Sequence, residues 1–495
     1  MMRTTAFLGL KSHQSTAFLA ATRMLVAAFI LALTVGSFHA AAEDWPKYNH
    51  DLANTGLSGE TGINSKNVAQ LQTKWTFTAS KMSATPAVAT INGTPMVFIP
   101  SWDGIMHALN AVTGVQIWSF KVDAIGNSYC NDTYCRMGSS PAVDVAQNLV
   151  LFGSSNAYLY ALNATTGALV WKVVTGDSNA GYEVWSSPAI YQGMVYIGVS
   201  SHGDNPCIVG GEVQAYDELT GDLDWSFNTI DQGTCPTGVP CVGGSVWSSV
   251  AIDEVNGIAY AGTGNPGSTC KPPTANAGLY PDSILAFNAS TGQLLNYFQA
   301  IRNDMMDHDF GATPVLHMTG QTNECTGHST TDYWITEGSK NANVYFAERG
   351  TAGLTGNVQQ QTEQGDVTAT AVIRPIEKVT SCGNKGKHII NYSNMIYVAA
   401  PSGLWVYNQS HKGAVTLVIE DTVSKQLRAA PAAIQDIVFF GGGDGNLYVS
   451  GGAGKIIATF PTDGSAIYGG IAISGNRVYF GTTLGTIYCM SVNGQ

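Results

Sequence analysis

A unit that recurs about every fifty residues constrains the fold of this chain more than any other feature. Thr-Gly turns at Gly114, Gly167 and Gly221 are spaced by 53 and 54 residues, and a related turn follows at Gly292 after a longer insertion. Around each turn the sequence reads as two short strands, the second ending in an aromatic residue, as in LNAVTGVQIW and LNATTGALVW. Another pair of strand-like segments precedes each turn, so one repeat holds four short strands.

Four strands at this period are typical of the blades of a β-propeller. Helical periodicity is almost absent and glycine is abundant, with 56 residues, which favours all-β structure. Eight repeats can be counted, and the last ends after its third strand. The segment at residues 71–80 reads as an isolated strand that completes this last blade and removes open sheet edges. The sequence therefore predicts an all-β, eight-bladed β-propeller of four-stranded blades, with the ring closed by an N-terminal strand.

The first 42 residues resemble a secretory signal. Three basic residues precede an apolar run at residues 24–35, and two alanines in A-x-A spacing follow, ending at Ala42. The apolar run is too short for a stable membrane anchor, and no later stretch is long enough to cross a bilayer. We therefore expect a signal peptide at residues 1–42, a single propeller domain at residues 43–495, no membrane span, and a periplasmic or secreted protein.

The charge of the chain restricts its partners. The full sequence has a formal net charge of −12, and loss of the leader, with its three basic residues and no acids, takes this to −15. Such an acidic chain repels nucleic acid and anionic lipid. We expect no nucleic-acid partner, and instead a small neutral ligand or a basic protein.

Nine cysteines lie beyond the leader, and export permits disulfides. Cysteine pairing cannot be read from spacing alone, but Cys489 lies in an apolar strand and is expected to stay free. No CxxC or CxxCH motif occurs, which excludes a zinc ribbon and a covalently attached c-type haem. The pairs that we consider are Cys130–Cys135, Cys235–Cys241, Cys207–Cys270 and Cys325–Cys382.

Three acids crowd the segment NDMMDHDFGA at residues 303–312, in a chain with only 12% charged residues. They are Asp304, Asp307 and Asp309, and an apolar, strand-like run follows at once. Carboxylates beside a core strand are costly unless a cation neutralises them. The alternative is that these acids lie in a solvated turn. Other motifs of the chain are needed to distinguish a cation site from such a turn.

Several motifs together make the chain similar to the pyrroloquinoline-quinone (PQQ)-dependent alcohol dehydrogenases, which are eight-bladed propellers, and within them to the polyvinyl-alcohol-dehydrogenase-like branch. The resemblance starts at DWPKYNHDLANTGLS, and the motifs GTGNP, DMMDHDFG, GGSVWSS and SKNANVYFAER carry it further. It implies an oxidoreductase that transfers hydride from a small or polymeric alcohol to PQQ with the help of a metal ion. Because the chain has no CxxCH motif for a haem, we expect an external electron acceptor, such as a soluble cytochrome c.

The resemblance assigns a role to each matching residue. Asp204 stands where the family has a glutamate, and the family's pair of adjacent cysteines is missing. The implied catalytic base is Asp307; the implied cofactor-binding residues are Arg136, Ser201, Trp247 and Lys340; the implied metal ligands are Asp204, Asn265, Asp307 and Asp309.

These residue types suit the chemistry of PQQ, a planar tricarboxylate with an electrophilic quinone. It needs an aromatic face, cations for its carboxylates, and a hard metal with oxygen ligands. If the acidic segment is an extended strand, Asp307 and Asp309 point to the same face and reach one ion. In the superfamily this spacing accompanies lanthanide use, so the resemblance implies either Ca²⁺ or a lanthanide ion.

Two other functions remain open at this point. The repeat also occurs in non-catalytic propellers that act as protein-binding scaffolds, in which a tryptophan packs between blades and an asparagine shapes a turn. A sugar-oxidising quinoprotein has the same fold, and the loops that line the mouth of the channel decide between sugars and alcohols.

Overall fold

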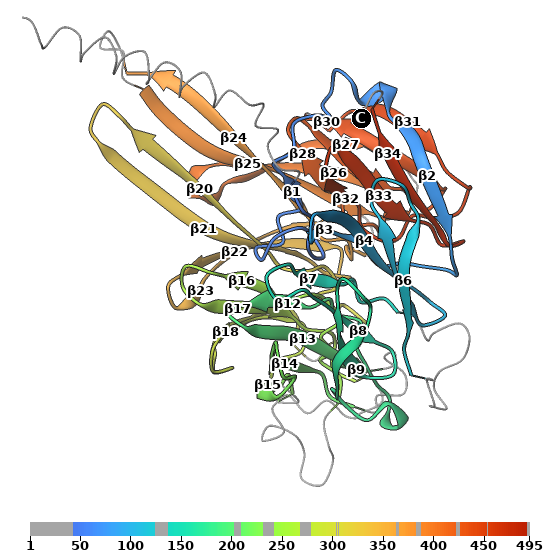
Figure 1. Cartoon of the computed structure of the whole chain (residues 1–495). Helices are drawn as coiled ribbons and strands as arrows, with labels where there is room; N and C mark the ends of the chain where they lie inside the picture. Colours follow the sequence, from blue (N-terminus) through green and yellow to red (C-terminus); the bar gives the residue numbers. More distant parts are fainter. Residues whose placement is uncertain are drawn as a thin grey trace, which may run out of the picture. The chain divides into compact units, whose positions relative to one another are not determined.

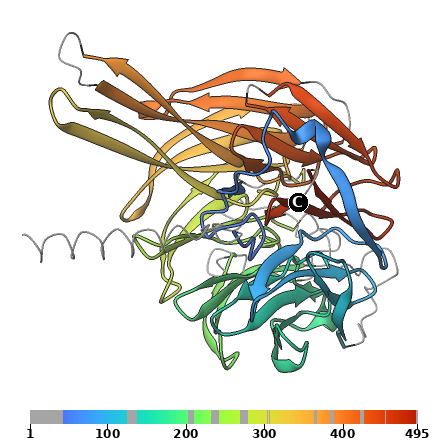
Figure 2. The ribbon, with the colours of Figure 1, turned by 45° about the horizontal axis from the view of Figure 1, so that its top comes forward.

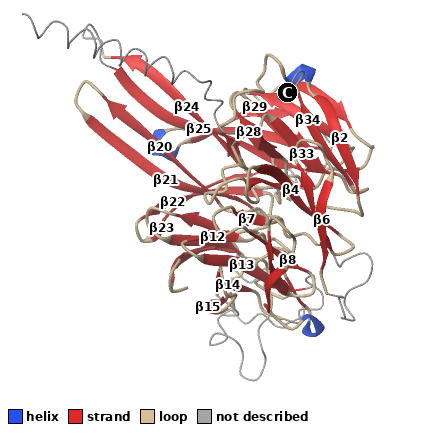
Figure 3. Ribbon diagram, in the orientation of Figure 1, coloured by secondary structure: helices blue, strands red, loops and turns tan. Residues whose placement is uncertain are grey.

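The computed structural model describes residues 43–123, 137–201, 209–230, 242–267, 279–302, 304, 306–362, 366–382, 388–421, 426–452 and 454–492 (Figure 1). Residues Glu43–Gln495 form one compact unit. The described part is almost entirely strands and loops (Figure 3), which confirms the all-β prediction. No helix within it has the length and apolar character needed to cross a membrane. The predicted signal peptide lies outside the described residues.

Antiparallel four-stranded sheets follow one another along the first part of the chain, each in the simple order of the sequence. In the third sheet a short extra strand, β11 (Tyr182–Glu183), pairs with the end of β13. The sheets consist of β3 (Ala87–Ile91), β4 (Thr94–Ser101), β5 (Ile105–Asn110) and β6 (Gln116–Lys121); β7 (Ala142–Asp144), β8 (Leu149–Ser154), β9 (Tyr158–Asn163) and β10 (Leu169–Val174); β12 (Ala189–Tyr191), β13 (Met194–Ser201), β14 (Glu212–Asp217) and β15 (Leu223–Asn228); and β16 (Ala251–Asp253), β17 (Ile258–Gly262), β18 (Ser283–Asn288) and β19 (Leu294–Gln299).

The second part of the chain departs from this pattern, because two four-stranded units join into one eight-stranded sheet. The next sheet takes up β1 (Leu57–Ser58) beside β28, and the last takes up β2 (Gln72–Thr78) beside β34. The remaining strands are β20 (Val315–Asn323), β21 (His328–Gly338), β22 (Asn343–Gly350) and β23 (Gly353–Thr362); β24 (Val372–Ser381), β25 (His388–Ala400), β26 (Gly403–Gln409) and β27 (Val415–Asp421); β28 (Ala432–Ile434), β29 (Ile437–Gly441), β30 (Asn446–Gly451) and β31 (Ile456–Pro461); and β32 (Ala472–Ser474), β33 (Arg477–Gly481) and β34 (Thr486–Ser491). Short 3₁₀ turns are η1 (Val68–Gln70), η2 (Ser178–Ala180) and η4 (His411–Gly413).

The repeated motif is a contact between neighbouring sheets. The indole Nε1 of Trp118 donates to the carbonyl of Ala164 at 2.9 Å, and a Cβ on Gly167 would lie 2.6 Å from the same ring. Gly167 also has a φ of +73°, so both the space and the backbone require glycine. The arrangement recurs for Trp75 with Ala111 and Gly114, for Trp171 with Glu218 and Gly221, and for Trp225 with Ala289 and Gly292.

Hydroxyl groups link the segments that precede the first strand of successive repeats. At the same position of successive repeats, a backbone N–H donates to the serine or threonine hydroxyl of the next repeat. The series stops at Ala430, which has no hydroxyl. The bonds run from Thr85 to Ser140 (2.9 Å), Ser140 to Ser187 (2.9 Å), Ser187 to Ser249 (3.0 Å), Ser249 to Thr313 (3.0 Å) and Thr313 to Thr370 (3.1 Å), and Gly470 donates to Thr85 (2.9 Å).

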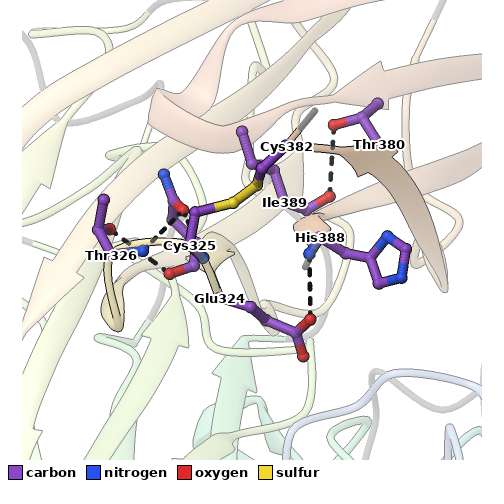
Figure 4. Close-up of a disulfide and its surroundings, with 8 residues drawn as sticks. Glu324, Cys325, Thr326, Thr380, Cys382, His388 and Ile389 are labelled. Atoms are coloured by element: carbon purple, nitrogen blue, oxygen red, sulfur yellow. Dashed lines mark hydrogen bonds between the residues drawn. A yellow bond between two sulfur atoms is a disulfide. The ribbon is translucent and has the colours of Figure 1, made fainter. Parts of the chain in front are cut away.

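Two long hairpins, β20–β21 and β24–β25, extend from the rest of the unit (Figures 1 and 2). They pair with each other where Gly320–Asn323 of β20 lies beside Ile389–Tyr392 of β25. A disulfide between Cys325 and Cys382 links their ends (Figure 4), which confirms this predicted pair.

Cys489 is free and buried, as expected. The other predicted cysteine pairs lie outside the described residues, and they involve Cys130, Cys135, Cys207, Cys235, Cys241 and Cys270.

Candidate functional site

Four of the predicted residues that bind cofactor or metal line one cavity of about 200 Å³ together with side chains that the sequence did not single out. Trp247 lies just before β16, Asp309 lies between β19 and β20, and Lys340 lies in the β21–β22 turn. The full lining is Trp185, Ser200, Ser201, Ser245, Trp247, Asp309 and Lys340. The site is therefore built from segments at the ends of strands in neighbouring sheets.

The Asp309 carboxylate accepts hydrogen bonds from three groups beside the cavity. Its Oδ1 accepts from the backbone N–H of Asn265 at 2.5 Å, and its Oδ2 accepts from Trp247 Nε1 at 3.1 Å and from Lys340 Nζ at 2.8 Å. A Cβ on Gly264 would lie 2.9 Å from Oδ1, so the glycine of the GTGNP motif allows the carboxylate to approach. Asp309 is 2% exposed, and the ammonium group of Lys340 balances its negative charge.

Lys340 is a fixed cation beside an aromatic face. Its Nζ also forms an ion pair with Asp307 at 2.6 Å and lies 5.2 Å from the centroid of the Trp247 ring. Burial alone would lower the pKa of Lys340, but the charge of Asp309 and the hydrogen bonds to Asp307 and Asp309 outweigh it and raise the pKa. The amine is therefore charged at every physiological pH.

The acidic segment is not the extended strand that the sequence suggested. Its described residues contain no strand, and Asp307 has a φ of +62°, in the left-handed region. The argument that alternate residues of a strand bring Asp307 and Asp309 to one face is therefore wrong. The two carboxylates meet instead at Lys340, and Asp304 accepts from the backbone and ring of His308.

Asp307 and Asp309 differ in their surroundings. The side chain of Asp307 is 51% exposed and that of Asp309 is 3% exposed. Both oxygens of Asp309 already accept hydrogen bonds, whereas the contact found for Asp307 in the described part of the chain is the one to Lys340. The Asp309 carboxylate therefore fixes the side chains of Trp247 and Lys340 by hydrogen bonds, whereas the Asp307 carboxylate is half exposed to solvent.

Of the remaining predicted site residues, the structure describes Asn265 and Ser201. Asn265 is buried, and its amide nitrogen donates to the Pro266 carbonyl at 3.1 Å. This hydrogen bond does not use the amide oxygen, which is the atom that would bind a cation. Ser201 lines the cavity, and its N–H donates to the Ser245 hydroxyl at 3.0 Å. Arg136 and Asp204 lie outside the described residues. Among the residues that are described, no three His, Cys, Asp or Glu side chains gather closely enough to hold a metal ion.

Two buried acids, Asp282 and Glu337, were not identified from the sequence, and Asp282 lies within electrostatic reach of the acidic segment and Lys340. Within the described part of the chain, neither carboxylate oxygen of Asp282 or Glu337 has a hydrogen-bond partner. Burial raises the pKa of Asp282 to about 9, and the charges of Asp304, Asp309 and Asp307 add to this effect. Burial likewise raises the pKa of Glu337 well above its usual range. The Asp282 carboxyl is therefore neutral at physiological pH in the metal-free protein, because burial and the acidic groups around it disfavour a further negative charge.

Sequence signals for the missed residues did exist. Asp282 directly precedes the apolar strand SILAF, the same pattern that drew attention to residues 303–312. Trp185 lies in VWSSPA, which matches the VWSSVA that contains Trp247 one repeat later. Aligning the repeats position by position would have identified Trp185.

Asp282→Asn should flatten the pH dependence of stability in the metal-free protein. An acid whose pKa is raised on folding binds a proton that the unfolded chain has already lost, so folding stability falls as pH rises between about 4 and about 9. The variant lacks this contribution, which amounts to at most about 1.4 kcal/mol per pH unit for one proton. Thermal unfolding in the presence of a chelator at pH 5, 6.5 and 8 measures it.

Asp217→Asn is the matched control for this measurement. Hydrogen bonds from the backbone of Thr220 and Leu219 lower the pKa of Asp217, so its contribution is constant above about pH 5. The difference in midpoint between variant and wild type should grow with pH for Asp282 and stay constant for Asp217. Equal behaviour of the two variants would show that Asp282 does not take up a proton on folding.

Comparison with known proteins identifies the family to which the chain is similar. A family model described as "PQQ: Glucose/ethanol/alcohol dehydrogenase, beta-propeller domain" matches residues 45–373. The dehydrogenase subunit of alcohol dehydrogenase (quinone) from Gluconobacter oxydans (strain 621H) is 31% identical over 301 residues, which cover 54% of this chain and 38% of that protein. The polyvinylalcohol dehydrogenase of a Pseudomonas species is 24% identical over 307 residues, which cover 56% and 46%. The chain thus matches less than half the length of these relatives.

A solved structure extends the similarity to the whole fold. The europium-containing methanol dehydrogenase superposes with a TM-score of 0.70 at 18% identity, covering 91% of this chain and 98% of that one. At this identity the likeness concerns the fold alone.

Proposed function

Because the chain belongs to the PQQ glucose/ethanol/alcohol dehydrogenase family of β-propellers, we propose that it is a periplasmic or secreted quinoprotein that oxidises an alcohol with PQQ as its cofactor. One observation carries the proposal above all others. Lys340, Asp309 and Trp247 are joined by hydrogen bonds in the wall of a single cavity, so a fixed cation, a fixed carboxylate and an aromatic face converge there. A planar, anionic quinone needs this combination.

The fold that we propose is a closed ring of eight blades around a central channel. The innermost strands support it, because each contacts the next in chain order and β32 contacts β3. Strand β2 pairs with β34 and, through Trp75, contacts the first sheet, as expected of a strand that closes the ring. The innermost strands are β3, β7, β12, β16, β20, β24, β28 and β32.

The chain's own residues bind and orient the cofactor in this proposal. The Trp247 indole supplies an aromatic face, and Asp309 holds the indole in place through Nε1. Lys340 supplies positive charge to the quinone oxygens, and Ser201 and Arg136 bind the carboxylates of the cofactor. When bound, PQQ supplies a quinone that takes up the hydride equivalent of the alcohol.

A hard cation fits the donors near the cavity. The Asn265 amide oxygen and the carboxylates of Asp307 and Asp309 are oxygen ligands, and the family resemblance adds Asp204. Burial and the charges of Asp304, Asp309 and Asp307 keep Asp282 protonated at neutral pH, and a bound cation would offset the repulsion among these carboxylates. We propose that the ion is Ca²⁺ or a lanthanide. We include a lanthanide because the fold is similar to that of a europium-containing methanol dehydrogenase. When bound, the ion would supply Lewis acidity.

Asp307 is the proposed general base. It is the more exposed of the two carboxylates, and it forms an ion pair at 2.6 Å with Lys340, which lines the cavity. Asp309 is less suited to this role, because both of its oxygens already accept hydrogen bonds from the wall. In the reaction Asp307 would take the hydroxyl proton of the alcohol while hydride leaves the carbon.

The proposed electron acceptor is external and basic, such as a soluble cytochrome c, because the chain is acidic, with a net charge of −12. The rate of reduction of a basic cytochrome c should fall by roughly tenfold or more between about 20 and about 300 mM salt, since salt screens the attraction between the proteins. Stopped-flow reduction of the cytochrome measures this, with an uncharged dye as control. A rate that is equally insensitive to salt for both acceptors would exclude electrostatic docking.

Dye reduction tests the proposed activity directly. The purified chain is loaded with PQQ and with Ca²⁺ or La³⁺, and a panel of primary alcohols, secondary alcohols, polyvinyl alcohol and aldose sugars is supplied. The proposal predicts reduction with at least one alcohol and none without PQQ. Activity with sugars only would replace the alcohol by a sugar, and no activity with any compound would favour a non-catalytic scaffold.

A further inference from the structure

Two tryptophans occupy the same position in consecutive repeats. Trp185 lies in VWSSPA and Trp247 lies in VWSSVA, each a few residues before an innermost strand. The backbone N–H of Ser187 donates to the hydroxyl of Ser249 at 3.0 Å, which ties the two segments together. Both indoles are partly exposed, and both line the same cavity.

Each indole is anchored in the same way. Trp247 Nε1 donates to the buried carboxylate of Asp309 at 3.1 Å, and Trp185 Nε1 donates to the carboxylate of Glu183, which is fully buried. Glu183 belongs to the short strand β11, which pairs with Ser200 and Ser201 at the end of β13. An additional strand thus places Trp185 beside the serines of the cavity wall.

The blade fold does not require tryptophan at this position. Neighbouring repeats with the same hydroxyl link carry small or polar residues there, namely Gly138, Gly311 and Thr368. Partly exposed indoles that face a cavity leave apolar surface in water, which is unfavourable until a flat ligand covers it. Tryptophan at this position is therefore an addition to the repeat pattern in two adjacent repeats, where the Trp247 ring also packs against Gly311 of the next repeat.

We propose that Trp185 is a second aromatic contact for the planar cofactor, in addition to Trp247. The inference rests on the proposed function, because it takes PQQ as the ligand of this cavity. Glu183 acts as a positioning residue, since it fixes the indole through Nε1. The serines at 200, 201 and 245 complete this side of the cavity with groups that donate and accept hydrogen bonds.

PQQ binding by Trp185 variants tests this assignment. Equilibrium dialysis against PQQ, with Ca²⁺ present, should give a Kd that is about 10- to 100-fold weaker for Trp185→Ala and within about threefold of wild type for Trp185→Phe, which keeps an aromatic face. The tryptophan emission lost on PQQ binding should also be smaller in Trp185→Phe, because one of two quenched indoles is absent. Trp171→Phe is the control: this indole of strand β10 donates to the Glu218 carbonyl and does not line the cavity.

The outcomes separate this inference from the function on which it rests. If wild type binds PQQ and Trp185→Ala binds it equally well, Trp185 is not a cofactor contact, while the proposed function stands. If Trp185→Ala does not fold, the emission lost by Trp185→Phe decides, and a loss equal to that of wild type overturns the inference. If wild type itself binds no PQQ, both fail.

Discussion

Asp307→Asn is expected to lower kcat by roughly 10²–10⁴-fold, the usual contribution of a general base. The carboxylate is half exposed and contacts Lys340, which lines the cavity, so its replacement by the isosteric amide should leave the fold intact. Affinity for PQQ should change by no more than a few-fold, because Asp309 still holds Lys340 and Trp247 in place. Dye reduction under saturating alcohol measures kcat, and equilibrium dialysis measures the affinity.

Asp309→Asn is the matched variant, since it changes the neighbouring carboxylate in the same way. The amide keeps one acceptor oxygen and replaces the other by a donor, so the three groups that share the two oxygens of Asp309 lose one of them and Lys340 loses a charged partner. PQQ affinity should therefore fall along with turnover. Near-normal kcat in Asp307→Asn would contradict the proposed role of Asp307. The base would then be Asp309 or Asp304.

Lys340→Met is expected to weaken PQQ binding by roughly 10²–10³-fold. The change removes the cation from the cavity and leaves Asp309 buried without its positive partner, and breaking such a pair typically costs several kcal/mol. Lys340→Arg keeps the charge and should retain more of the affinity than Lys340→Met. Dialysis of both variants against PQQ in the presence of Ca²⁺ measures the effect.

Lys172→Met is the control for Lys340→Met, because Lys172 makes the same types of contact outside the cavity. It forms an ion pair with Asp123 and lies 5.5 Å from the centroid of the Tyr158 ring. Its substitution should leave PQQ affinity unchanged. Equal affinity of the Lys340→Met variant and wild type would show that Lys340 does not face the cofactor.

Much of the fold was predictable because the repeat encodes contacts between sheets. The aromatic residue of one repeat and the Thr-Gly turn of the next are both visible in the sequence, and they pack together in the structure, as Trp118 and Gly167 do. The joined hairpins were not predicted, because the pairing of β20 with β25 lies in extensions that have no counterpart in other repeats. Residue types alone do not identify such a pairing.

The site was predictable where a motif carried a residue into the cavity. Trp247, Lys340 and Asp309 were all identified before the structure, and all three line the same wall. The backbone around Asp307 was not, because a left-handed conformation in a non-glycine residue depends on the surrounding contacts and leaves little signal in the sequence. Asp282 was missed although it directly precedes an apolar strand, because that pattern does not show that the carboxyl is buried without a partner.

Stoichiometric PQQ binding is the central claim, and one titration tests it most directly. The purified, metal-free chain is mixed with excess PQQ alone, with PQQ and Ca²⁺, and with PQQ and La³⁺, and unbound cofactor is removed by gel filtration. We predict that about one quinone per chain, measured by absorbance, stays bound when one of the ions is present and that far less is retained without an ion. A chain that elutes without quinone absorbance under all three conditions would contradict the account and favour a propeller that binds no cofactor.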